Sequence, residues 1–299
     1  MSSSRHPVAL RLERQVGGAT RLLATVMLLP LVDGIFAALV LADALSTTVG
    51  IVQVGLLVFG GSATLAVIVA EMDRNMRQQA TSVAIVGVPL LTLAVAEAAI
   101  APAIASLLNI VIFERFAAVV IVAIAAKTAS ATIGEYLPRP SIIIALGLIA
   151  SIDPSGLVLR VTPNVELMLR AAASALVGIG FALGVVVLRP YIEGLVDIDR
   201  FRFGTAIALG TLAFSVINLV PSNAPLPVFV VAALLAFDPS DEMEMEATST
   251  DDSRPSPDAE MATTDGGNGY DDADDIAEPA EKGYGYPGED RADERAPWL

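Results

Sequence analysis

The sequence predicts an all-α protein embedded in a lipid bilayer, with about eight transmembrane helices. Three observations predict this class. Of the 299 residues, 54% are hydrophobic, which is more than a soluble domain normally contains. The apolar residues fall in successive runs whose lengths approach the roughly 20 residues that a helix needs to cross a bilayer. Basic residues then concentrate in alternate loops between these runs.

The expected spans follow a polar N-terminal arm of residues 1–19. They lie at residues 20–42, 50–70, 81–102, 111–133, 141–161, 167–188, 203–221 and 224–237. The last run has only about 14 residues, a length nearer to that of a re-entrant or tilted segment. We therefore predict eight crossings and keep seven as the alternative.

The distribution of basic residues predicts the orientation. Lys and Arg in short loops stay on the cytoplasmic side of a membrane. By our count, 11 bases lie in the N-terminal arm and the alternate loops that share its side, against three in the remaining loops. This predicts a multi-pass protein of the cell membrane whose N-terminus is cytoplasmic. With eight crossings, the C-terminal tail is cytoplasmic as well.

The net charge of −15 comes from residues 238–299, which contain 20 Asp and Glu against 4 Lys and Arg. This segment lacks apolar periodicity and is rich in Gly, Pro, Ser and Thr, so it cannot bury enough surface to offset the entropy of ordering. We predict a disordered acidic tail. The acidic surplus and the excess of Arg over Lys indicate a halophilic setting.

Two internal copies are predicted in the membrane region. At an offset of 120 residues Asp33 matches Asp153 and Gly60 matches Gly180; at an offset of 123 residues Arg77, Gly87 and Pro102 also find identical partners. The predicted units are residues 20–110 and 141–237, connected by a linking helix and loop at 111–140. Both units begin on the cytoplasmic side, so the sequence predicts a parallel repeat.

Two carboxylates lie within the apolar runs. Asp33 falls about 13 residues and Asp153 about 12 residues into its span, near the bilayer midplane, where an aspartate costs roughly 2.5–3.5 kcal/mol. Proline and glycine beside them predict that both helices break there, as many transporters break helices at a binding site. The expected helix-breaking residues are Pro30, Gly34, Pro154 and Gly156.

Other interpretations of these residues stay open. Asp153 followed by Pro154 is also typical of a helix N-cap, and Asp33 could be protonated and hydrogen-bonded to a neighbouring helix. Glu97 lies nearer the outer side and extends the expected ion or substrate path. Lys127 near a cytoplasmic helix end either reaches to the headgroups or serves as counter-ion to one of the aspartates.

Several functional classes are excluded by composition. The chain has no cysteine, and its single histidine, His6, lies in the polar arm, so we expect no metal site in the apolar region. No phosphate loop, dinucleotide motif or nucleic-acid patch is present, and we expect no cofactor, no nucleic-acid partner and no enzymatic activity. The lipid bilayer is the expected partner. A small ion or solute is the expected ligand.

The segments LLPLVDGIF, LLVFGGSATLAV, ERFAAVVIVAIAAKTASATIGEYLP, ASIDPSG and DIDRFRFGTAIALG resemble a family of uncharacterised multi-pass membrane proteins from haloarchaea. The resemblance covers about residues 1–238 and implies no activity or site residues. The arrangement of three-helix units with a buried acid is loosely similar to exporters of the lysine-exporter type, although these usually contain inverted repeats.

We therefore expect a secondary transporter or exporter in which Asp33 and Asp153 face each other across the repeat interface and bind the coupling ion. The alternative is a membrane scaffold or assembly protein whose buried acids only hold helices together and whose acidic tail recruits partners. A membrane enzyme that uses carboxylates is a weaker third hypothesis. Transport predicts a hydrated cavity, whereas a scaffold predicts dry, hydrogen-bonded aspartates.

Overall fold

The computed structural model describes residues 18–72, 75–153 and 164–237. All regular secondary structure within these residues is helical, apart from two isolated β-bridges. This confirms the all-α class. The acidic tail, nearly all of the N-terminal arm, and the predicted helix-breaking residues Pro154 and Gly156 lie outside the described residues.

The first apolar helix is broken. It consists of α2 (Gly18–Val32) and α3 (Ile35–Leu41), which together form a 24-residue stretch long enough to cross a membrane. Gly34 separates the two parts with a φ of 75°, a left-handed conformation that glycine adopts without the steric cost of a side chain. Pro30 lies inside α2, one turn before the break.

The second apolar helix, residues 48–71, is broken as well. It consists of α4 (Thr48–Val54), the π-helix η1 (Gly55–Phe59), α5 (Ser62–Ala66) and the π-helix η2 (Val67–Glu71). Its two halves meet at Gly60 and Gly61 with a bend of 50°. The Gly60 N–H donates to the Gly55 carbonyl, five residues earlier, which is the π-helical pattern.

Four longer helices and three shorter ones complete the described structure. The long helices are α6 (Met76–Ala105), α7 (Ile110–Ala129), α10 (Val165–Ile192) and α11 (Ile198–Val216). The shorter helices are α8 (Ala131–Tyr136), α9 (Pro140–Ser151) and α12 (Pro225–Leu235). Asn or Asp side chains cap the four long helices, and proline opens α9 and α12.

Helix length and composition support a membrane protein. Residues 18–41, α6 and α10 are each long and apolar enough to cross a bilayer, and the bent segment 48–71 makes a fourth candidate. By sequence, α7 and α11 each carry three charged residues, whereas α9 and α12 are apolar but short. The predicted eight crossings are not confirmed.

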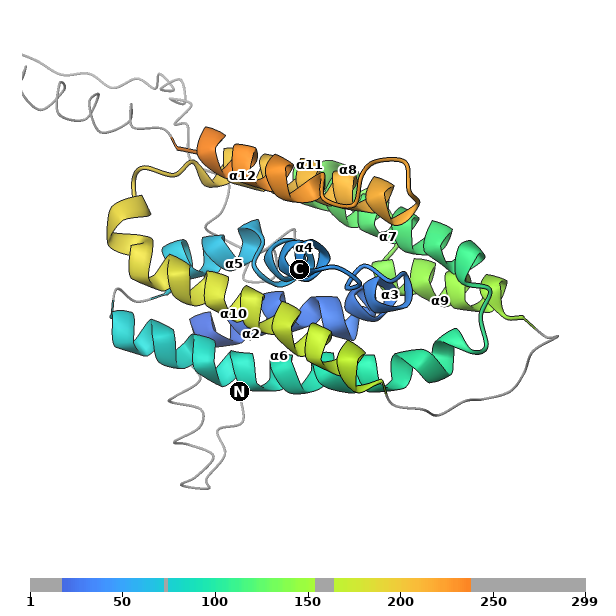
Figure 1. Cartoon of the computed structure of the whole chain (residues 1–299). Helices are drawn as coiled ribbons and strands as arrows, with labels where there is room; N and C mark the ends of the chain where they lie inside the picture. Colours follow the sequence, from blue (N-terminus) through green and yellow to red (C-terminus); the bar gives the residue numbers. More distant parts are fainter. Residues whose placement is uncertain (1–17, 73–74, 154–163, 238–299) are drawn as a thin grey trace, which may run out of the picture. The chain divides into compact units, whose positions relative to one another are not determined.

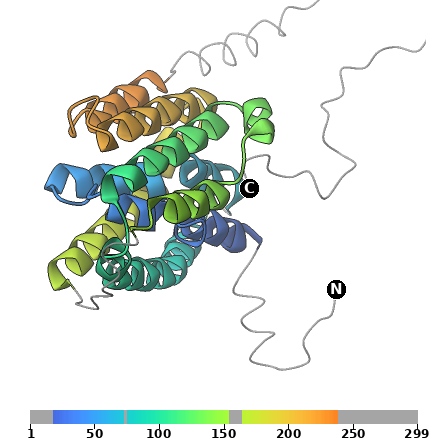
Figure 2. The same cartoon turned by 90° about the vertical axis from the view of Figure 1, so that its right-hand side faces the viewer.

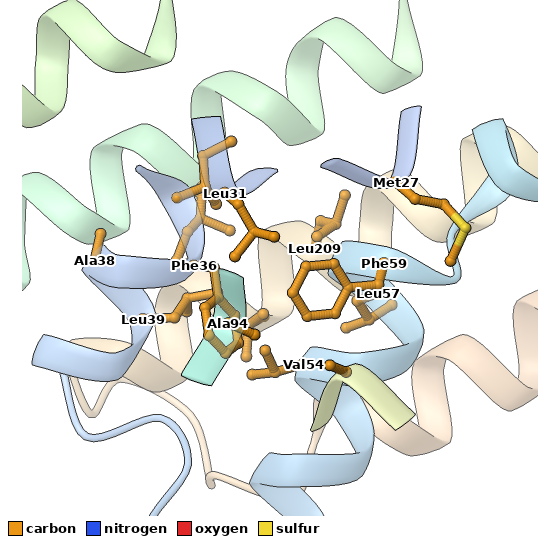
Figure 3. Close-up of a cluster of buried hydrophobic side chains, with 14 of the residues drawn as sticks. Met27, Leu31, Phe36, Ala38, Leu39, Val54, Leu57, Phe59, Ala94 and Leu209 are labelled. Carbon is orange, nitrogen blue, oxygen red and sulfur yellow. The ribbon is translucent and has the colours of Figure 1, made fainter. Parts of the chain in front are cut away.

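The two broken helices lie between two helical layers within residues 18–237. One layer contains α6 packed on α10, and the other contains α7 packed on α11, with α12 beside α11 (Figures 1 and 2). Phe36 of the first broken helix and Phe59 of the second face each other at a ring-centroid distance of 5.1 Å (Figure 3). The apolar core thus centres on the contact between the two broken helices.

The second broken helix crosses α10 closely. A Cβ atom built on Gly55 would lie 2.5 Å from the Ser174 carbonyl oxygen, and one built on Gly178 would lie 2.5 Å from the Cβ of Phe59. Only glycine permits backbones to approach this closely. By contrast, a Cβ atom on Gly180 or Gly184 would meet nothing within 4 Å.

The predicted parallel repeat is not confirmed. The main partners of α10 are α6 and the segment 48–71, while α9 packs on α7 and α11 packs on α7 and α12. The helices of residues 141–237 therefore pack largely on helices outside that range.

Candidate functional site

The break at Asp33 and Gly34 exposes backbone groups inside the core. The Gly34 N–H donates to the Leu31 carbonyl at 2.9 Å, which closes α2, and the Ala38 N–H donates to the Gly34 carbonyl at 2.9 Å, which opens α3. The N–H groups of Ile35 to Ala37 precede the first helical bond of α3, so they have no acceptor within it. These free N–H groups give the N-terminus of the helix a partial positive charge, which attracts a negative group.

Glu97 supplies a negative group at this position. It projects from α6, and its carboxylate lies near the backbone N–H of Ala37, in the first turn of α3. Its Oε2 atom is buried and has no partner at hydrogen-bond distance within the described residues. The structure therefore places Glu97 beside the break of the first helix.

Asp33 lies at the break itself and is half-buried. Lys127, at the end of α7, and Arg139, which precedes α9, are both close enough to attract its carboxylate electrostatically. The structure thus places Lys127, for which a counter-ion role is one of the two expectations, within electrostatic reach of Asp33. Arg139, which is one of the 11 bases counted for the predicted orientation, is an addition to the site.

Asp153 lies elsewhere. Its N–H donates to the Leu107 carbonyl at 3.0 Å, at the turn between α6 and α7. Ile144, which faces Gly34, comes seven residues before Ser151 at the end of α9. At 1.5 Å per residue, about 10 Å of helix separates the two positions. The structure does not bring Asp33 and Asp153 together around one space.

A small apolar cavity lies next to the break. Pro30, Ile35 and Leu39 line it from the first broken helix, and Leu57 and Val58 line it from the second. Ile121 and Ile124 of α7 and Leu209 of α11 complete its wall. The site therefore combines an apolar cavity with carboxylates and basic side chains nearby.

Arg189 is a buried basic residue whose contacts the sequence did not predict. Its side chain is 7% exposed and donates hydrogen bonds to the carbonyl oxygens of Met72, at 2.9 Å, and Val69, at 2.8 Å. These carbonyls end the second broken helix, so Arg189 ties that helix to α10. The available signal was an arginine directly before Pro190, inside a continuous helical pattern.

Within the described residues, no three His, Asp or Glu side chains gather in one group that could hold a metal ion. Asp33 and Glu97 come from different helices, and the cations near Asp33 are arginine and lysine. Single carboxylates such as Asp33 and Glu97 can exchange a proton or a small cation.

Comparison with known proteins relates part of the chain to a family. Residues 90–217 match a protein family of unknown function (DUF5794). No curated protein and no solved structure matches the chain. The matched range includes Glu97, Lys127 and Arg139 and excludes Asp33, and it agrees with the expectation of an uncharacterised family.

Proposed function

We propose that the protein is a secondary membrane transporter of a small ion or solute, with its binding site at the break between α2 and α3. One observation carries the proposal: a carboxylate from α6, Glu97, lies near Ala37 in the buried first turn of a discontinuous helix. Discontinuous helices at mid-depth provide backbone groups and helix ends for ions and substrates in many transporters.

The polar groups suit a proton-coupled or cation-coupled cycle. Asp33 and Glu97 lose negative charge when they bind a proton or a cation, and each lies where charge matters, Asp33 near two bases and Glu97 at a helix end. An intramembrane ionisable residue is expensive to keep in lipid, which favours a functional role. Asp153 remains a sequence prediction at a separate position.

The distribution of bases supports eight crossings with the N-terminus inside. Arg77 begins α6, Lys127 ends α7, Arg139 precedes α9, and Arg189 and Arg200 flank the turn from α10 to α11. In the proposed topology all of these ends are cytoplasmic, as the preference for positive charge inside requires. The acidic tail then follows α12 on the same side.

The test is flux in proteoliposomes containing the purified full-length protein. Asp33→Asn and Glu97→Gln remove one charge each with little change of shape, and Asp199→Asn, at a largely exposed residue of α11, is the matched control. We expect proton or cation flux to fall in the first two variants and to stay unchanged in the control. Folded variants at Asp33 and Glu97 with wild-type flux of every gradient tested would contradict the proposal.

The scaffold hypothesis stays as the second candidate because the cavity is lined by apolar side chains and both carboxylates face cations or backbone donors. In that case Asp33 and Glu97 hold helices together. A scaffold predicts no flux in the wild-type protein and a lower thermal stability for Asp33→Asn and Glu97→Gln. Transport predicts wild-type flux that these substitutions abolish.

A further inference from the structure

We infer that the chain consists of two interlocked, inverted copies of one four-helix unit, related by an axis that passes through the apolar cavity. The first copy comprises residues 18–41, α6, α7 and α9. The second copy comprises residues 48–71, α10, α11 and α12. This arrangement gives the proposed site access from either face of the membrane, and that part of the inference rests on the proposed function.

Helix lengths follow this correspondence. Helices α6, α7 and α9 have 30, 20 and 12 residues, and α10, α11 and α12 have 28, 19 and 11. Asn109 caps α7, and Asp197, 88 residues later, caps α11. Pro140 opens α9, and Pro225, 85 residues later, opens α12.

Burial along α6 and α10 distinguishes this correspondence from the parallel one. Nine residues of α6 are buried, and seven of the nine positions 88 residues later are buried too. At the offset of 123 residues, only four of the nine are buried. The seven matching pairs are Val83/Ala171, Val86/Ser174, Gly87/Ala175, Leu90/Gly178, Ala94/Ala182, Ala98/Val186 and Ala101/Arg189.

The same backbone contact occurs within each of the two copies. In the first copy the Asn109 N–H donates to the Ser151 carbonyl at 2.6 Å, next to the bridge between Leu108 and Ile152. In the second copy the Asp197 N–H donates to the Ala236 carbonyl at 2.9 Å, next to the bridge between Val196 and Phe237. The end of the short helix thus pairs with the turn between the two long helices in both copies.

Each short helix crosses its long neighbour at the same place. Gly147 of α9 lies against Phe116 of α7, and Ala232 of α12 lies against Gly204 of α11. Gly204 comes 88 residues after Phe116, and Ala232 comes 85 residues after Gly147. The glycine lies on the short helix in the first copy and on the long helix in the second, but the crossing point is the same.

The copies run in opposite directions. Arg189, near the end of α10, reaches Met72, shortly before α6 begins, so the end of α10 lies beside the start of α6. Because α6 and α10 are antiparallel, the bridge at Ile152 and the bridge at Phe237 lie at opposite ends of the bundle (Figure 1). An axis in the membrane plane relates such copies.

Equivalent residues meet at the cavity. Ile121 and Leu209, which are 88 residues apart, line it from α7 and α11. The two broken helices line it beside their breaks, where the sequence LVDG at 31–34 corresponds to LVFG at 57–60. Inverted-repeat transporters bind their ligands at the repeat interface, and exchange of conformation between the copies opens that interface to each side in turn.

The inverted copies can be tested by labelling single cysteines, because the natural chain contains none. Ile152 and Phe237 are about half exposed and occupy equivalent positions, so Ile152→Cys and Phe237→Cys will leave packing nearly intact. An impermeant thiol reagent is added to right-side-out or inside-out vesicles carrying the full chain. We expect Ile152→Cys to react only from outside and Phe237→Cys only from inside. Reaction of both from one face, or no reaction of Ile152→Cys, overturns the inverted relation.

Access to the cavity is tested with Ile121→Cys and Leu209→Cys, and with Val120→Cys as the control, a buried neighbour that does not line the cavity. We expect the two cavity thiols to react from either face and the control to stay unreacted. Reaction from one face only, or from neither, overturns two-sided access. If the wild-type protein shows flux but positions 152 and 237 are labelled from the same side, only the inverted copies are refuted. If these positions are labelled from opposite sides but the wild-type protein shows no flux, only transport is refuted.

Discussion

Replacing Gly178 by alanine tests the close crossing of α10 and the second broken helix. The new methyl group would lie 2.5 Å from the Cβ of Phe59 and 3.1 Å from the Gly55 carbonyl oxygen, whereas nonbonded carbon atoms prefer about 3.5–4.0 Å. The helices must separate by about 1 Å. Such overpacking costs about 1–3 kcal/mol, and the better helix propensity of alanine returns at most about 1 kcal/mol.

We therefore expect Gly178→Ala to lower the free energy of unfolding by about 1–2 kcal/mol. In a protein of this size, each kcal/mol lowers the melting temperature by roughly 2–4 °C. The assay is the temperature at which the purified protein in detergent loses its monodisperse peak in size-exclusion chromatography. Gly180→Ala and Gly184→Ala on the same helix are matched controls, because their methyl groups would meet nothing within 4 Å. Equal losses in all three variants would refute the argument from close packing.

Further substitutions test three other kinds of contact by the same thermal assay. Arg189→Met leaves the Val69 and Met72 carbonyl groups without their donor, which should cost about 1–3 kcal/mol for each carbonyl. The control Arg170→Met breaks a more exposed ion pair with Glu166 and should cost about 1 kcal/mol or less. Similar losses of stability in the two variants would show that the buried contacts of Arg189 contribute little. Gly204→Ala should lower the thermal stability because the new methyl group meets Ala232, whereas Gly210→Ala should not. An unchanged thermal stability of Gly204→Ala would contradict close contact between α11 and α12 at this position. Asn109→Ala and Asp197→Ala should each cost about 1 kcal/mol as lost helix caps, and no loss in either variant would argue against capping.

Sequence patterns sufficed for the helical class and for a polar break in the first apolar helix. Gly34 adopts a positive φ, which few other residues tolerate, so Pro30 and Gly34 were informative in the sequence. The second break was harder to predict. It lies at Gly60 and Gly61, and glycine serves helix contacts and helix breaks equally well.

The apolar run continues to residue 161, which predicts that Asp153 lies at mid-depth. The helix α9 ends at Ser151 instead, since Asp153 precedes a proline and the residue before proline avoids the helical conformation. Giving that local rule more weight than the length of the run would have moved Asp153 to the helix end. The position of Glu97 at the α3 terminus depends on tertiary packing, and no local pattern predicts it.

The sequence also contained a signal for the inverted copies. The stretch IDPS at 152–155 recurs as FDPS at 237–240, after two helices that begin with proline. The parallel correspondence instead used glycines and single charges, which are frequent in any membrane helix. Burial periodicity separates the two alignments, but it becomes visible only when neighbouring helices are known.

The π-helical turns of residues 48–71 have a mechanical consequence. A π-turn accommodates one more residue than an α-turn, so conversion of η1 to α geometry would rotate the following residues by about 100° about the helix axis. Leu57 and Val58, which wall the cavity, lie within that turn. A shift of one hydrogen-bond register would therefore turn one side chain out of the cavity and another into it, without separating the layers on either side.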